Sequence, residues 1–133
     1  AVFNIGRALL IVDALRTGNM TLLHQAMGDR MHEPYRLPVI PGALEARRRA
    51  LEAGGVAVSL SGAGPGLLVF ANNHHERIGQ AMQAAFAEAG VAARYWVMDT
   101  TDRGAQIEMG DGVAPVAPAS MRSAQRRSTT RRR

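Results

Sequence analysis

The stretch Val56-Ala57-Val58-Ser59-Leu60-Ser61-Gly62-Ala63-Gly64-Pro65-Gly66-Leu67-Leu68-Val69-Phe70-Ala71 decides the fold, because it contains two apolar runs separated by a short glycine-rich connection. We expect strands at residues 56–60 and 66–71. Residues 61–65 form the tight connection between them, and glycine permits the positive φ values that such turns use. The stretch therefore predicts two neighbouring strands of a mainly antiparallel sheet.

Upstream of these strands, the sequence predicts two consecutive helices. The first covers residues 2–16, and its apolar positions spread over most of the helix circumference, so we expect it to be largely buried. Gly18 follows in the position of a left-handed C-terminal cap. Either Asn19 or Thr21 is expected to cap the second helix, which should end near residue 30 or 31.

Two prolines separate the second helix from the third. Because a proline disfavours the helical conformation of the residue before it, we expect residues 32–38 to be non-helical. Pro41 suits the first turn of a helix. The third helix is therefore expected over residues 42–53, before two consecutive glycines.

Downstream of the two strands, the pattern predicts one more helix and two more strands. The helix covers residues 75–89 and ends at Gly90, and its inner stripe consists of Ile78, Ala81, Met82, Ala85 and Phe86. Strands are expected at 93–98 and 105–108. The order of elements predicts an α+β fold in which helices cover a mainly antiparallel sheet.

Composition limits the classes of protein to which this chain can belong. It has 133 residues and no cysteine, which excludes disulfides and thiolate metal sites. No apolar run reaches the roughly 18 residues that a membrane span needs. The net charge of +5 comes from arginines in the last dozen residues. Residues 109–133 lack hydrophobic periodicity and are expected to be disordered, so contact with nucleic acid is expected only non-specifically through this tail.

The glycine-rich connection is the first candidate functional segment. Its small residues let backbone N–H groups approach an anion such as a phosphate. An ordinary β-turn explains the same composition, so the loop alone leaves both interpretations open. The residues concerned are Ser61, Gly62, Ala63, Gly64 and Pro65.

The second candidate segment is His32-Glu33-Pro34-Tyr35-Arg36. Its prolines stiffen a loop that carries one guanidinium, and the planar fork of arginine suits a carboxylate. A surface ion pair of Arg36 is the alternative. His32 has no partner at metal-ligand spacing, and neither do His74 and His75, so we predict no metal site and assign no catalytic residue.

Four landmarks in the order of one family give these segments a joint meaning. They are Ala1-Val2-Phe3-Asn4-Ile5-Gly6-Arg7, Asp29-Arg30-Met31-His32-Glu33-Pro34-Tyr35-Arg36, Ile40-Pro41-Gly42 and Ser61-Gly62-Ala63-Gly64-Pro65. In these residues the chain resembles the homoserine kinase family of the GHMP kinase superfamily, from Ala1 to about Glu108. The resemblance implies a GHMP C-terminal domain over residues 1–108, with a ferredoxin-like antiparallel sheet covered by helices, truncated on its N-terminal side.

The same resemblance implies an enzyme of the cytoplasm, an ATP-dependent phosphotransferase that phosphorylates the hydroxyl of L-homoserine in threonine biosynthesis. Arg36 matches a family arginine that binds the substrate, and Ser61, Gly62, Ala63, Gly64 and Pro65 would support the phosphate loop of the other domain. ATP and Mg²⁺ would be bound mainly by the N-terminal domain, which this chain lacks. The chain is therefore expected to be inactive alone, to need that domain as a partner, and to belong to a homodimer.

Two other functions stay possible at this point. Another GHMP kinase, of the mevalonate or galactose type, shares the glycine loop but has no reason to carry Glu33-Pro34-Tyr35-Arg36. A non-catalytic ferredoxin-like module, regulatory or binding nucleic acid through its arginine tail, is the alternative outside enzymes.

Overall fold

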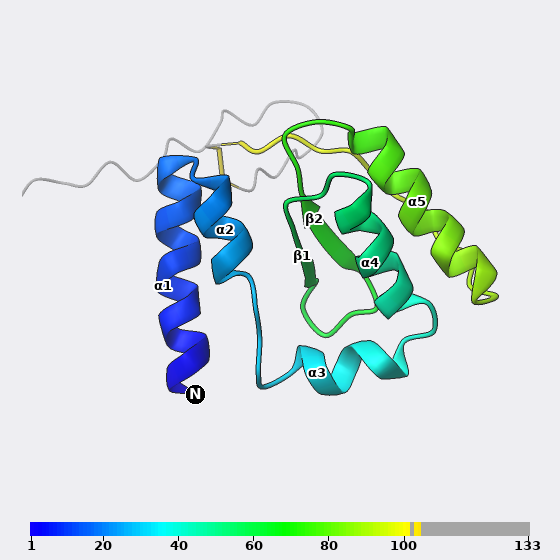
Figure 1. The fold of residues 1–133 in the computed structure, drawn as a ribbon, viewed down its shortest axis with the longest axis horizontal. Helices are drawn as coiled ribbons and strands as arrows, with labels where there is room; N and C mark the ends of the chain where they lie inside the picture. The colour runs from blue at the N-terminus through cyan, green and yellow to red at the C-terminus, as the bar shows by residue number, and fades with distance from the viewer. Residues whose placement is uncertain (102, 105–133) are drawn as a thin grey trace, which may run out of the picture. The chain divides into compact units, whose positions relative to one another are not determined.

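The computed structural model describes residues 1–101, 103 and 104. Residues Ala1–Met98 form one compact unit, whose helices and strands are labelled in Figure 1. Its elements are α1 (Val2–Thr17), α2 (Met20–Ala26), α3 (Glu33–Arg36), the 3₁₀ helix η1 (Leu37–Val39), α4 (Ala43–Glu52), β1 (Ala57–Leu60), β2 (Leu67–Phe70) and α5 (His75–Glu88).

The two strands form the expected antiparallel hairpin. Ala57 pairs with Phe70 and Leu60 pairs with Leu67, and the Ser61 N–H continues the ladder by donating to the Gly66 carbonyl at 2.8 Å. Helices together with this antiparallel pair confirm the α+β prediction.

The alternation of side chains along the hairpin divides the core between its two faces. Val58 and Leu60 point to one face. Val58 packs there with Ala50 of α4 and Ile78 of α5, and Leu60 packs with Ala43 of α4. Ala57 lies on the other face and packs in a cluster with α1 and α2 residues. Fully burying a side chain of the size of Val, Leu or Ile stabilises the fold by about 1.5–3 kcal/mol, and an alanine methyl contributes less. Figure 1 shows the corresponding arrangement, with α1 and α2 on one side of the hairpin and α4 and α5 on the other.

The first half of the chain departs from the expectations at two helices. α2 ends at Ala26, not near residue 30 or 31, because Met27 has an extended backbone. The expectation that residues 32–38 are non-helical was wrong, because α3 and η1 lie there. Both begin with a proline in their first turn, where the missing N–H has no helical partner to lose.

Several helix ends agree with the sequence patterns. Gly18 has φ of 68° and closes α1 as a left-handed cap. Asn19 caps α2 by accepting a hydrogen bond from the Leu22 N–H at 2.9 Å. The start of α4 differs from the expectation. The helix begins at Ala43, after Gly42 with φ of 80°, so Pro41 precedes the helix instead of forming its first turn.

The prediction that α1 is largely buried was wrong. Ala14 is the one residue of this helix in the buried class, whereas Ile5, Leu9 and Val12 are 62%, 69% and 63% exposed. The helix contacts α2 over one side, and most of its large apolar side chains stay exposed in the described part of the chain. No helix in this part of the chain is both long enough and apolar enough to cross a membrane.

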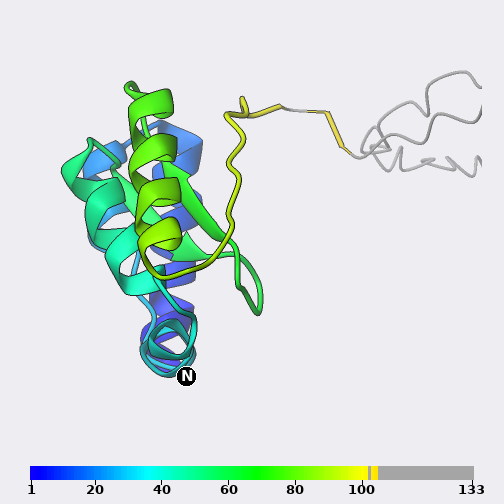
Figure 2. The same cartoon turned by 90° about the vertical axis from the view of Figure 1, so that its right-hand side faces the viewer.

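Residues 93–98 do not form the predicted strand. Within the described part of the chain they pair with no strand, and they run back alongside α5 (Figure 2). The Gln83 side chain donates to the Ala93 carbonyl at 2.7 Å, and the Tyr95 hydroxyl donates to Glu76 at 2.7 Å. These contacts attach the segment to α5 instead of β2. The strand expected at 105–108 and the tail 109–133 lie outside the described residues.

Candidate functional site

The fold brings the two candidate segments into contact. The Nε–H of Arg36 donates a hydrogen bond of 2.9 Å to the carbonyl of Ala63, 27 residues further along the chain. Arg36 is the last residue of α3, and its side chain is exposed. The bond occupies Nε and directs the guanidinium to the surface of the glycine loop, so its Nη groups can donate to a ligand there.

Backbone conformation makes the loop a concentrated source of N–H groups. Gly62 and Gly64 have φ of 56° and 81°, values that L side chains rarely adopt. The Gly64 N–H donates to the Ser61 carbonyl at 2.9 Å, whereas those of Gly62 and Ala63 have no backbone acceptor among the described residues. Exposed N–H groups next to a guanidinium are suited to an anion, either a carboxylate or a phosphate.

Asp29 builds the N-terminal end of α3. Its carboxylate accepts hydrogen bonds from the N–H groups of Met31, His32 and Glu33 at 2.6 to 2.8 Å, and from the side-chain amide of Asn4. Partial desolvation acts to raise the pKa of Asp29, but the Asn4 and backbone hydrogen bonds together hold that pKa well below its usual range. Asp29 therefore keeps its negative charge at the start of α3, where the charge interacts favourably with the helix dipole and stabilises the helix.

The beginning of α1 is attached to the same segment. Asn4 Oδ1 accepts from the Arg30 N–H at 3.2 Å, while its amide donates to Asp29. The guanidinium groups of Arg7 and Arg30 lie over the Phe3 ring, 4.9 and 4.1 Å from its centroid, in cation–π contacts. Residues near the start of the chain thus fix the position of α3 from one side.

Glu33 is the residue of this site that sequence reasoning missed. It is 7% exposed, and its Oε1 accepts from the Leu60 N–H at 2.7 Å and from the Ser59 hydroxyl at 2.9 Å. Arg47 of α4 lies 3.4 Å from its Oε2. Glu33 stood inside the quoted Glu-Pro-Tyr-Arg segment, but its partners are 14 to 27 residues away, and no local pattern identifies them.

The other candidates take no part in this contact. His32 is exposed at the N-terminal end of α3, and the described residues contain no group of three or more His, Asp or Glu side chains placed to hold a metal ion. The three consecutive arginines of α4 pair with different carboxylates, Arg47 with Glu33, Arg48 with Glu45 and Glu52, and Arg49 with Glu45 and Glu88. Hydrogen bonds from Arg48 and then Arg49 lower the pKa of Glu45 to about 2.

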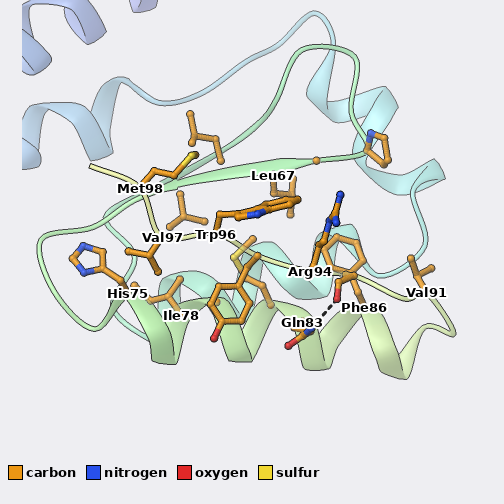
Figure 3. Close-up of a pocket in the computed structure, with 18 of the residues that line it drawn as sticks. Leu67, His75, Ile78, Gln83, Phe86, Val91, Arg94, Trp96, Val97 and Met98 are labelled. Carbon is orange, nitrogen blue, oxygen red and sulfur yellow. Dashed lines mark hydrogen bonds between the residues drawn. The ribbon is translucent and has the colours of Figure 1, made fainter. Parts of the chain in front are cut away.

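Within residues Ala1–Met98, a cavity lies apart from the contact between Arg36 and Ala63. Its volume is about 490 Å³, and it lies between β2, α5 and the extended residues 91–98 (Figure 3). Leu67, Ile78, Phe86 and Trp96 give it mostly apolar walls, and the Arg94 guanidinium stacks on Trp96 at 4.6 Å. Of the sequence-predicted site residues it contains Pro65 alone, so we do not assign the candidate site to this cavity.

Comparison with known proteins gives a consistent family. Residues 11–88 match the family model described as GHMP kinases C terminal. The chain is 42% identical over 107 residues to a homoserine kinase of Moorella thermoacetica, covering 80% of this chain and 36% of that protein. A homoserine kinase of Persephonella marina is 40% identical over 108 residues, with 81% and 36% covered.

A solved structure agrees with these sequence relatives. The crystal structure of a homoserine kinase from Cytophaga hutchinsonii superposes with a TM-score of 0.61 at 32% identity, covering 66% of this chain and 29% of that one. The present chain spans about a third of the length of the curated relatives that it matches.

Proposed function

The chain belongs to the GHMP kinase family, whose C-terminal domain it matches over residues 11–88, and on this premise we propose that it is the acceptor-binding part of a homoserine kinase. The enzyme would transfer the γ-phosphate of ATP to the hydroxyl of L-homoserine, in threonine biosynthesis. Relatives that carry this name, at about 40% identity over most of the chain, support the choice of acceptor.

The observation that carries the proposal is the contact between Arg36 and the glycine loop. Arg36 donates through Nε to Ala63, which leaves its Nη groups to bind the carboxylate of homoserine. The neighbouring loop offers N–H groups to a phosphate or to the loop that holds it. Because phosphoryl transfer depends mainly on positioning and on charge stabilisation, a carboxylate clamp beside a phosphate-binding loop suits this reaction.

The described residues include donors suited to the phosphates of ATP but no carboxylate cluster suited to Mg²⁺. The N–H groups of Gly62 and Ala63 are suited to phosphate oxygens. We assign Ser61, Gly62, Ala63, Gly64 and Pro65 together the role of supporting the phosphate loop of the other domain. No cluster of carboxylates in the described part of the chain fits Mg²⁺. We therefore propose that ATP and Mg²⁺ bind mainly to residues of an N-terminal kinase domain, which agrees with the greater length of the relatives. This chain alone would then have no kinase activity.

Three further features belong to the same proposal. The GHMP domain extends over residues 1–108, with 109–133 outside it. We also propose that the enzyme is a cytoplasmic homodimer. We assign no catalytic base and no metal ligand to this chain.

The product of the complete gene tests the proposal. It should release ADP in the presence of homoserine, and not with serine or mevalonate. Turnover of mevalonate would indicate another GHMP kinase, and no turnover from a folded protein would favour a binding module.

The substitution Arg36→Ala tests the assigned residue. It should weaken homoserine capture by about 1.5–3 kcal/mol, the typical contribution of a charged hydrogen bond. Arg16→Ala is the matched control, because Arg16 forms an exposed ion pair with Asp13 on α1. An Arg36→Ala enzyme with unchanged KM for homoserine and unchanged kcat would contradict the assignment.

A further inference from the structure

Glu33 is the single charged residue of the buried class among the residues that the structure describes. Its three partners lie on other elements, with Ser59 and Leu60 in β1 and Arg47 in α4. One carboxylate therefore joins the start of α3 to the strand that leads into the glycine loop. A buried carboxylate with this set of donors is strongly directional, because the geometry of each bond restricts the position of the helix.

The bond to Leu60 is formed on the free side of β1. Leu60 pairs with Leu67, and the next N–H, that of Ser61, points to β2 and donates to Gly66. Because successive N–H groups of a strand point in opposite directions, the N–H of Leu60 points away from β2. Glu33 accepts this N–H directly before the loop begins, so it fixes the position at which the chain enters residues 61–65.

Arg36 provides the second attachment of the same helix. It lies one turn after Glu33 and donates to Ala63 at 2.9 Å. α3 thus contacts the strand end through Glu33 and the loop through Arg36, and the two contacts are three residues apart both on the helix and on the strand-loop segment.

We infer that Glu33 is a positioning residue, which fixes the Arg36 guanidinium relative to the glycine loop and so sets the geometry of acceptor binding. This role rests on the proposed function of Arg36. Glu33 touches neither substrate in this scheme and acts through Arg36.

A double-mutant cycle in the product of the complete gene tests this. Glu33→Ala should raise the KM for homoserine by roughly 10- to 100-fold, as expected when a ligand-binding group loses its support. In the Arg36→Ala background the same change should alter this KM by less than about twofold, because the group that Glu33 positions is gone. A full, multiplicative effect of Glu33→Ala in that background overturns the inference.

Two controls separate positioning from general stability. Glu33→Gln keeps an oxygen for the Leu60 N–H and the Ser59 hydroxyl, so it should return the KM to within a few-fold of the wild-type value. Glu45→Ala removes another carboxylate that binds arginines, on the exposed face of α4, and should leave the KM unchanged. If Glu33→Ala does not fold, Glu33→Asp replaces it, since its shorter side chain withdraws the carboxylate from Leu60.

A measurement independent of turnover keeps the inference distinct from the proposed function. Hydrogen exchange at the Leu60 amide and at Arg36 Nε–H, followed by NMR, should be faster in Glu33→Ala and nearly unchanged in Glu33→Gln and Glu45→Ala. Absent homoserine turnover in the wild-type protein refutes the proposed function, and with it the role in acceptor binding. Unchanged exchange in Glu33→Ala shows instead that Glu33 does not position Arg36.

Discussion

Gly79, in the middle of α5, is where one added methyl group should change the structure most clearly. A Cβ atom at this position would lie within 2.6 Å of the Cδ2, Cε2 and Cγ atoms of the Tyr95 ring. Carbon atoms prefer separations of about 3.5–4.0 Å, so the ring would have to move by about 1 Å or more. That movement would strain the hydrogen bond between the Tyr95 hydroxyl and Glu76.

Two opposing contributions set the effect of Gly79→Ala on stability. Replacing a helical glycine by alanine favours the helix by about 1 kcal/mol. Overpacking a filled space costs about 1–3 kcal/mol. The net effect should therefore lie between neutrality and a loss of about 2 kcal/mol. Gly6→Ala is the matched control, because Gly6 is also helical and has nothing within 4 Å of its added Cβ.

The chain contains one tryptophan, and it lies next to Tyr95. The free energy of unfolding in urea should be about 1–3 kcal/mol lower for Gly79→Ala than for Gly6→Ala, because both gain helix propensity and only the first is overpacked. The emission of Trp96 and its quenching by iodide should change in Gly79→Ala alone. Equal stabilisation by both substitutions, with unaltered Trp96 emission, would refute the packing of residues 93–98 on α5.

Three other outcomes follow from the same structure. Folding lowers the pKa of Asp29, so the ionised carboxylate stabilises the protein fully above the unfolded pKa of about 3.9, and this stabilisation is lost as the pH falls from there towards the folded pKa. Asp29→Asn should therefore weaken the loss of unfolding free energy in acid, measured by urea titrations at several pH values. Gly64→Ala should cost about 1–3 kcal/mol of unfolding free energy, because φ is positive and the Cβ would lie 3.0 Å from Ile40 and Leu60; Gly62→Ala, with open space around it, should cost less. Leu9→Glu should reduce concentration-dependent association in sedimentation, since Leu9 lies on the exposed apolar face of α1, and unchanged association would exclude that face.

The substitution at Asp29 also tests how the site is built. Asp29 contacts no ligand in the proposed scheme, but three N–H groups at the start of α3 depend on its carboxylate. If Asp29→Asn alters the KM for homoserine as well as acid stability, the start of α3 contributes to the placement of Arg36 together with Glu33.

The sequence alone determined the elements whose cause is local. The strands of the hairpin, the left-handed cap at Gly18 and the inner stripe of α5 depend on residues within a few positions of one another. For the cap of α2 the sequence left Asn19 and Thr21 open, and the structure shows Asn19 in this role. Backbone sterics, helix periodicity and strand alternation act over that range, so a sequence pattern is sufficient to predict them. The sequence also identified the glycine loop and Arg36 as candidate site residues. The composition of the loop pointed to it, and the order of the four landmarks along the chain pointed to both.

The tertiary structure decided what depends on distant partners. Prolines at 34 and 38 predicted a non-helical segment, but capping by Asp29 and the bonds of Glu33 to β1 stabilise a turn of helix there. Residues 93–98 have the apolar pattern of a strand, yet Gln83 and Glu76 attach them to α5. The apolar circumference of α1 predicted burial, but burial requires a second surface, and hydrophobicity does not specify which surface covers it. The contact between Arg36 and Ala63 joins residues 27 positions apart, and only the packing of α3 against the hairpin brings them within hydrogen-bond distance.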